Sequence, residues 1–361
     1  MTTFFIVTLA AIVTCFLIPA SIFSYASKGN AVFNRPNSIK NSVFIPIFTV
    51  LLVSTCAAYF FIYNPKEFVS SLSFSEVTLP LIGGLIIYLS GYNHKLSKFT
   101  PLLILLCAAS AVFAAPDDSM SFLPQFNVWI NRVLLIAVWA IFTFIYRHTN
   151  TGDGMLSVQS LTISIGVIAL SIFGVLPHMI GFMAWITTAA LLALLAFSWH
   201  PSRVKISSTA ASSFGFIIFS LIAFSTYEGC APCVLIFSAY MLVDIVWAIA
   251  YKLSFIDRYK DVTNNTAYRQ ALEEGMNPAQ AAAFPVRIQM LLIFFGVFQA
   301  YSPNSVSLVM LSAIITIWFC YKFRNVPAPT QSLKNINLQV IEELQERVKD
   351  IKDIVNRDDD I

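Results

Sequence analysis

The sequence predicts an all-α protein, a polytopic helical membrane bundle of about eleven transmembrane helices. Hydrophobic residues make up 57% of the chain and charged residues only 11%, whereas about a quarter of the residues in soluble domains are charged. Apolar runs close to the length of a membrane-spanning helix recur along the chain. The net charge of +3 gives no argument for a nucleic-acid partner.

The predicted spans all lie within residues 1–325, which we interpret as one transmembrane domain. Their ranges are 4–26, 43–63, 78–92, 100–115, 128–146, 158–176, 180–198, 212–227, 232–252, 285–301 and 305–322. The first run has no charged segment before it and no small-residue cleavage site leading to soluble sequence. We therefore interpret it as a retained helix rather than a removed signal.

Basic residues alternate between the predicted loops, and this alternation predicts the orientation. Loops 27–42, 93–99, 147–157, 199–211 and 253–284 all carry Lys or Arg, whereas the loops between them carry mainly Asp and Glu. Short loops rich in Lys and Arg remain in the cytosol. We therefore expect a periplasmic N-terminus and a cytoplasmic C-terminus.

The longest of these loops, 253–284, contains two helical patterns. An amphipathic helix is expected around Asn265 to Glu274. A second helix is expected to begin at Pro278, because proline suits the first helical position and Asn277 suits the N-cap before it. A solvated connector is the alternative interpretation of this loop.

Residues 326–361 are expected to form a cytosolic amphipathic helical tail. Its apolar residues recur three and four apart, at Ile341, Leu344, Val348, Ile351 and Val355. This spacing forms an a/d stripe about two heptads long, which is marginal as an isolated helix. We expect segment 336–356 to dock on a protein partner, on a second copy of the chain or on the cytosolic loops, and a frayed charged helix is the alternative.

Five short segments in chain order form a pattern of motifs. They are Asn34-Arg35-Pro36-Asn37 with Ile45-Pro46, Ala137 to Ala140 leading to Gly152-Asp153-Gly154-Met155, Pro201 to Lys205 with Phe214-Gly215-Phe216, Asp244 with Lys252, and Arg269 to Gly275. Together they resemble the polyprenyl-phosphate N-acetylhexosamine-1-phosphate transferases. The likeness is strongest to the undecaprenyl-phosphate GlcNAc-1-phosphate transferases that initiate enterobacterial common antigen and O-antigens.

The resemblance implies a bundle in the bacterial inner membrane, with Pro36, Asn37, Gly215, Asp244 and Lys252 as structural positions. It also implies transfer of a sugar phosphate from a UDP-sugar to a polyprenyl phosphate, with Mg2+ held by carboxylates. The family's acidic and histidine positions are replaced here by Tyr92, Asn93, Asn150, Ser208, Thr266, Tyr268 and Arg269, whereas Asp153 is retained. The comparison thus implies a catalytically degenerate relative without a metal cofactor.

The number of carboxylates in the predicted cytosolic loops also argues against a metal site, without reference to any family. Loops 27–42, 93–99 and 199–211 contain no Asp or Glu. The loop carboxylates before the tail are Asp153, Asp257, Asp261, Glu273 and Glu274. Mg2+ prefers several anionic oxygens, so a lone carboxylate among amides and hydroxyls seldom holds it. An active enzyme with a rearranged site that uses Asp261, Glu273 and Glu274 is the alternative.

Cytosolic cations are the candidate ligands for a phosphate headgroup. They are Arg35, Lys40, Lys95, Lys98, Arg147, Arg203, Lys205 and Arg269. Arginine binds phosphate through paired hydrogen bonds and lysine as a point charge, so neither needs a metal. Positive-inside topology alone also accounts for cations in these loops.

Two retained acids have structural and functional interpretations. Asp244 lies within an apolar span, where an acid is costly. We expect it to fix helix packing through a hydroxyl such as that of Tyr240, or to pair with a basic loop residue. Asp153 has two equally good interpretations. It forms an Asx-type turn in Thr151-Gly152-Asp153-Gly154, or it is a catalytic residue that has been retained.

Cys230 and Cys233 form a C-x-x-C motif with an internal proline in a loop that we place outside the cytosol. We expect a local disulfide, or two thiols at a helix start, rather than a redox centre, because no thioredoxin-like domain accompanies the motif. A zinc site is disfavoured because no second ligand pair lies nearby.

Three functions are compatible with the sequence. The first is an inner-membrane protein that binds polyprenyl phosphate or a lipid-linked sugar, or that regulates or scaffolds assembly of a cell-envelope glycan such as O-antigen, capsule or exopolysaccharide. The second is an active sugar-1-phosphate transferase. The third is a lipid-phosphate transporter, although the chain shows no inverted repeat.

Overall fold

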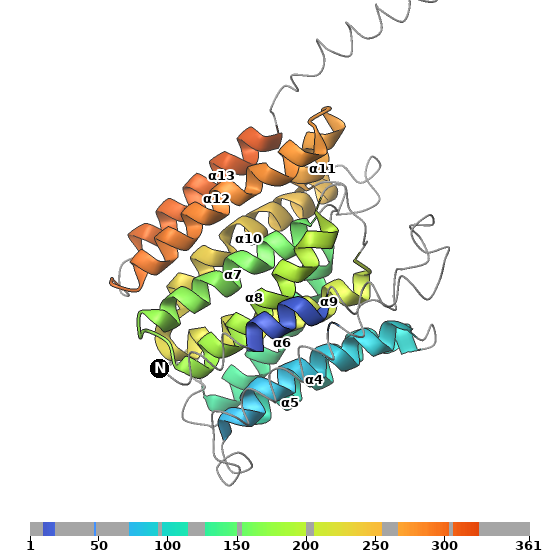
Figure 1. Ribbon diagram of the computed structural model, residues 1–361, viewed down its shortest axis with the longest axis vertical. Coiled ribbons are helices and arrows are strands. Elements are labelled where there is room, and N and C mark those ends of the chain that lie inside the picture. Colours follow the sequence, from blue (N-terminus) through green and yellow to red (C-terminus); the bar gives the residue numbers. More distant parts are fainter. Residues whose placement is uncertain are drawn as a thin grey trace, which may run out of the picture.

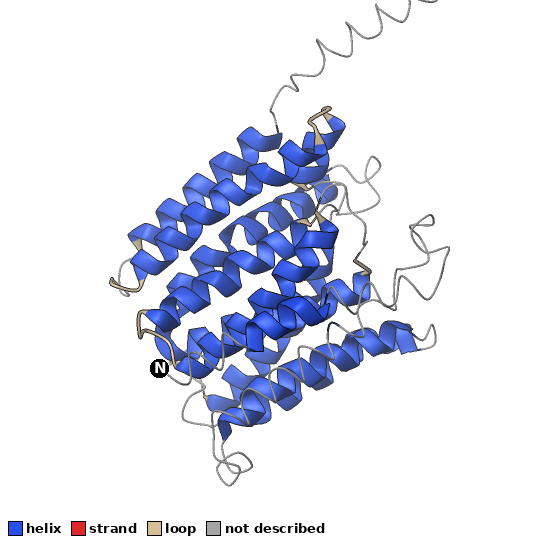
Figure 2. Ribbon diagram, viewed as in Figure 1, coloured by secondary structure: helices blue, strands red, loops and turns tan. Residues whose placement is uncertain are grey.

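The computed structural model describes residues 10–18, 47, 72–92, 96–114, 127–149, 154–199, 206–254, 266–302 and 306–324. Within these ranges every regular element is helical, as Figure 2 shows. The all-α prediction is therefore confirmed for the part of the chain that the structure describes. Most of the predicted second span and the whole tail 326–361 lie outside it.

The long helices lie side by side as a bundle (Figure 1). Their bounds are α4 Leu72–Tyr92, α5 Thr100–Ala114, α6 Val128–Tyr146, α7 Met155–Ile172, α8 His178–Ser198, α9 Ser208–Ser225, α10 Ala231–Ser254, α12 Pro278–Gln299 and α13 Ser307–Arg324. Short helical turns η1 (Leu96–Phe99), η3 (Arg147–Thr149) and η4 (Thr226–Cys230) and the short helix α11 (Ala267–Glu273) connect them.

Six helical stretches among the described residues are long and apolar enough to cross a membrane, by length and composition. They are Val128–Tyr146, Met155–Ile172, His178–Ser198, Ser208–Ala250, Pro278–Gln299 and Ser307–Arg324. The fourth stretch contains two helices, because Gly229 has a φ of 80° and breaks the helical path between α9 and α10. The protein is thus a membrane-embedded helical bundle, while the number of about eleven spans and the orientation stay predictions.

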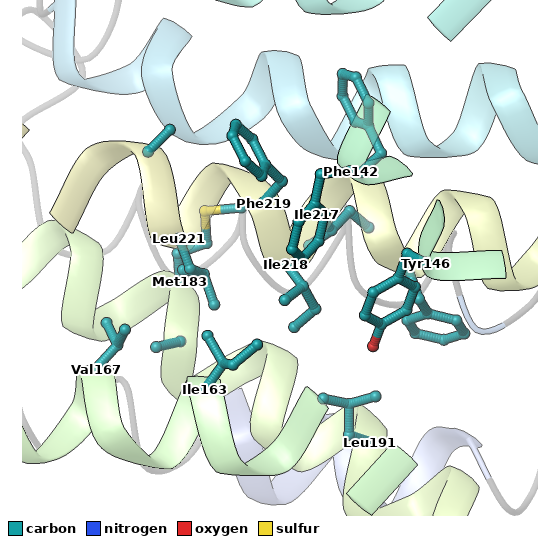
Figure 3. Packing of buried hydrophobic residues seen from close by; sticks show 14 of the residues in the cluster. Phe142, Tyr146, Ile163, Val167, Met183, Leu191, Ile217, Ile218, Phe219 and Leu221 are labelled. Carbon is teal, nitrogen blue, oxygen red and sulfur yellow. The ribbon is translucent and has the colours of Figure 1, made fainter. Parts of the chain in front are cut away.

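Helix α7 occupies the centre of the bundle. Of the residues in its 18-residue apolar segment, 83% are buried inside the protein. The corresponding shares are 28% for α13 and 33% for α6, which lie at the periphery. Figure 3 shows Ile163 and Val167 of α7 in the cluster that also contains Met183 of α8 and Ile218 of α9. Inner helices are therefore held by protein contacts, and outer helices expose apolar side chains such as Trp318 in the way that lipid-facing helices do.

Glycines allow aromatic rings to pack directly against helix backbones. A Cβ at Gly166 or Gly296 would lie 2.6 Å or 2.2 Å from the ring of Phe237, so this α10 side chain fills the space between α7 and α12. A Cβ at Gly215 would lie 2.7 Å from Tyr146. Small residues at helix crossings allow the close approach that drives association in lipid.

The two helices predicted in loop 253–284 are present. α11 covers Ala267–Glu273, and α12 begins at Pro278 with Asn277 as its N-cap. The Asn277 side-chain oxygen accepts a hydrogen bond from the Ala279 amide at 3.1 Å. The prediction of a capped helix start at this point is confirmed, and α12 runs on through Pro285 into the bundle.

Candidate functional site

Several helix ends that adjoin the predicted cytosolic loops meet at one end of the bundle, on the right of Figure 1. The C-terminus of α4 packs on the N-terminus of α9, where Gly91 faces Thr209. The start of α7 packs on the end of α8, since a Cβ at Gly154 would lie 3.5 Å from the Ser198 carbonyl oxygen. The candidate site is therefore built from loops that are far apart in the chain.

The contact between α4 and α9 lies beside two positions that the resemblance aligns with acids. Tyr92 is the last residue of α4, and Ser208 is the first residue of α9. A Cβ at Gly91 would lie only 2.2 Å from Thr209 Cγ2, so glycine is what permits this approach. Ser208 is exposed at the helix start, and the Ser207 hydroxyl caps α9 by accepting from the Ala210 amide at 3.2 Å.

A second junction is a buried charge network around Asp244. Its Oδ1 accepts a hydrogen bond from Arg324 Nη2 at 2.9 Å and another from the Ala267 amide at 2.8 Å. Arg324 Nη1 also donates to Gln270 Oε1 at 3.0 Å, and the guanidinium lies 5.2 Å from the Trp247 ring centre. One carboxylate thereby joins α10, α11 and the end of α13.

This network shows which of the predictions for Asp244 holds. The acid faces the bundle and pairs with a basic residue, which is Arg324. The hydroxyl of Tyr240 is buried and has no hydrogen-bond partner among the described residues, so it does not hold Asp244. Lys252 lies in α10, in a stretch for which only the backbone is described.

Helix α11 carries three of the replaced family positions. Thr266 is its N-cap residue and is buried, as is Tyr268, whereas Arg269 is exposed. Because Asp244 accepts from the amide of Ala267, the start of α11 is held against α10. The position of Arg269 thus depends on a buried ion pair in which Asp244 belongs to the resembling motifs and Arg324 does not.

Three headgroup candidates fall among residues with described side chains. Lys98 in η1, Arg147 in η3 and Arg269 in α11 are all exposed. The Arg147 guanidinium lies 4.6 Å from the Phe144 ring centre, and η3 packs against both α9 and α10. The predicted residues that lie outside the described ranges are Arg35, Pro36, Asn37, Lys40, Asn93, Lys95, Asn150, Asp153, Arg203 and Lys205.

The described residues do not fit the Mg2+ that the resembling family uses. No group of three or more His, Cys, Asp or Glu side chains able to hold a metal occurs in the described part of the chain. Ser208 offers a neutral hydroxyl at the α4–α9 junction, and the Asp244 oxygen already accepts from Arg324 and Ala267. Among the described residues, the α4–α9 junction thus offers no carboxylate and the second junction offers one that is already paired, whereas Mg2+ prefers several anionic oxygens. The absence of a metal cofactor stays a prediction, because Asn93 and Asp153 lie outside the described residues.

Arg324 and Gln270 are the residues that sequence reasoning missed. The signal for Arg324 is its place at the end of an apolar helix, because an acid within one apolar helix is usually paired, and a cation at the end of another is a suitable partner. Gln270 carries no sequence signal of its own.

Scanning the chain against protein-family models finds no match, and a search of curated proteins finds none either.

Proposed function

We propose that this protein is a catalytically inactive relative of the polyprenyl-phosphate sugar-1-phosphate transferases that binds a polyprenyl phosphate or a lipid-linked sugar. In this proposal the exposed cations at one end of the bundle bind the phosphate groups, and no metal takes part. The bound lipid remains chemically unchanged. The protein then serves assembly of a cell-envelope glycan as a carrier-lipid binder, regulator or scaffold.

The observation that carries the proposal is the junction of α4 and α9. Gly91 contacts Thr209 there, and the neighbouring positions in sequence are Tyr92 and Ser208, neither of which provides a carboxylate for a shared metal site. Losing several kcal/mol of charge stabilisation lowers a rate by orders of magnitude, at about 1.4 kcal/mol for each tenfold change. The junction thus supports a protein that keeps the helix packing of a transferase but has lost its catalytic activity.

The exposed cations support binding of an anion without a metal. Arg147 and Arg269 present guanidinium groups, which bind phosphate through paired hydrogen bonds. Removing the acids from such a region also removes repulsion toward the phosphate. Weak surface attraction becomes specific when several cations converge on one headgroup.

Two measurements test this function with the purified protein in lipid nanodiscs. Native mass spectrometry with undecaprenyl phosphate should show binding that Mg2+ does not change and that the double variant Arg147→Gln and Arg269→Gln weakens about tenfold. Lys66→Gln, on the side predicted to be periplasmic, is the matched control and should leave binding unchanged. Metal-dependent release of UMP from UDP-GlcNAc would instead establish the active transferase.

The tail is the proposed point of contact with other proteins. Segment 336–356 lies outside the described residues, and its a/d stripe is suited to a partner helix or to a second copy of the chain. Deleting residues 330–361 should abolish co-purification with such a partner while headgroup binding persists. A deletion that abolishes both would contradict separate roles for bundle and tail.

A further inference from the structure

Two buried thiols lie where α9 is joined to α10. Cys230 is the last residue of η4, and Cys233 is the third residue of α10. Their exposed fractions are 5% and 2%, and both are free cysteines. The two cysteines are three residues apart at the start of α10, and residues three apart in a helix lie on the same face. The sulfur atoms are therefore neighbours before any bond joins them.

The joint places this pair close to the surface of the bundle. Glu228 and Gly229, the two residues before Cys230, are exposed. Gly229 has a φ of 80°, which L side chains rarely adopt, so the chain changes direction immediately before the first thiol. The other described cysteines, Cys15, Cys107 and Cys320, lie singly in helices and far from one another in sequence.

The sequence favoured a local disulfide or two thiols at a helix start over a redox centre. Because both cysteines are free and lie three residues apart at the start of α10, we propose instead that Cys230 and Cys233 are a reversible dithiol–disulfide pair that reacts with small neutral disulfides at the α9–α10 joint. Thiol–disulfide exchange requires a thiol that an external disulfide can reach and a second thiol beside it. Cys230 follows the exposed residues of the turn and attacks first. Cys233, in the first turn of α10, then resolves the mixed disulfide. A neutral donor is favoured because Glu228 is exposed beside the pair.

The exchange balances in two steps. Cys230 loses its proton, its sulfur bonds to one sulfur of the donor disulfide, and the other donor sulfur leaves as a thiolate and takes up a proton. Cys233 then loses its proton and attacks the Cys230 sulfur, which releases the second donor thiol. The two cysteines together lose two electrons and two protons, and the donor disulfide is reduced to two thiols.

The spacing of the motif suits closure of this bond. Cys230 and Cys233 are separated by Ala231 and Pro232 at the start of a helix, so the covalent ring is small and its closure requires no movement of distant elements. The bond would tie η4 to the first turn of α10. Oxidation therefore changes the stiffness of the joint between α9, which begins at Ser208, and α10, which contains Asp244.

Mass spectrometry of the full-length protein in nanodiscs tests the proposal. The protein is treated with 2-hydroxyethyl disulfide, labelled with N-ethylmaleimide and digested. The peptide that contains both cysteines should lack both labels and weigh less by two hydrogen atoms, and dithiothreitol should restore both labels. Cys107 and Cys320 should be unchanged, as internal controls.

Single variants identify the order of attack. Cys233→Ser should retain a mercaptoethanol adduct on Cys230, whereas Cys230→Ser should form no adduct. In the wild-type protein, persistence of both maleimide labels, or a stable adduct in place of the internal bond, would overturn the proposal. The wild-type result decides the question even where a variant fails to fold.

Discussion

Arg324 and Asp244 form a buried ion pair across 80 residues of sequence, with 2.9 Å between Nη2 and Oδ1. The exposed fractions of the two side chains are 5% and 4%. Desolvation of both charges offsets much of their attraction, so such a pair adds little net stability. Removal of one partner is a different matter, because it leaves the other charge buried and uncompensated.

Asp244→Leu should therefore destabilise the bundle by about 3–5 kcal/mol. The loss has two sources, since Arg324 loses its counter-charge and the Ala267 amide loses its acceptor. Unfolding in mixed micelles gives the free energy, and hydrogen exchange reports the protection of the Ala267 amide. Unchanged exchange at Ala267 would contradict the inferred anchoring of α11.

Asp244→Leu combined with Arg324→Met should recover most of that loss. Both buried charges are then absent, and apolar side chains of similar size often replace a buried pair without net cost. The four proteins of the double-mutant cycle, measured in the same micelles, give the coupling energy of the pair. Additive losses from the two substitutions would show that the ion pair is not what links α10 to α13.

Local signals in the sequence predicted the helices and several of their boundaries. Asn277 followed by Pro278 marked the start of α12, because capping chemistry depends only on neighbouring residues. The long apolar runs likewise predicted the helices of the bundle. These features needed no knowledge of which helices pack together.

The partners of individual side chains could not be predicted in this way. The pairing of Asp244 with Arg324, and the approach of Gly91 to Thr209, depend on how α4, α9, α10 and α13 pack in three dimensions. Periodicity identifies a buried face but not the helix that covers it. The scarcity of carboxylates in the predicted cytosolic loops was visible in sequence, whereas the anchoring of α11 required the fold.

Gly296→Ala should destabilise the contact between α10 and α12 by roughly 1–3 kcal/mol. The added methyl group would lie 2.2 Å from Phe237 Cε1, and the same ring is confined on its other side by Gly166. Thermal unfolding in detergent measures the loss. Adding Phe237→Leu should reduce the penalty of the alanine, because the smaller side chain leaves room for it. An equal penalty in both backgrounds would contradict a clash with Phe237.

Restoring acids at the α4–α9 junction should create a divalent-metal site. In Asn93→Asp combined with Ser208→Asp, two carboxylates replace neutral side chains. Ser208 precedes Thr209 at the contact with Gly91, and Asn93 follows Gly91 by two residues in the sequence, so we expect the two acids to lie close together. Mg2+ and Mn2+ are typically held by one or two carboxylates together with water. Titration with Mn2+, followed by electron paramagnetic resonance, should show one additional bound ion relative to the wild type.

We expect the additional Mn2+ to bind because the two new acids lie close together. The control variant therefore places the second acid far from the first. Asn93→Asp combined with Val306→Asp adds the same charge, but Val306 is exposed just before the start of α13, the opposite end of that helix from Arg324. This variant should bind no additional Mn2+. Equal binding by both double variants would attribute the effect to net charge, and no binding by either would contradict a shared site at positions 93 and 208.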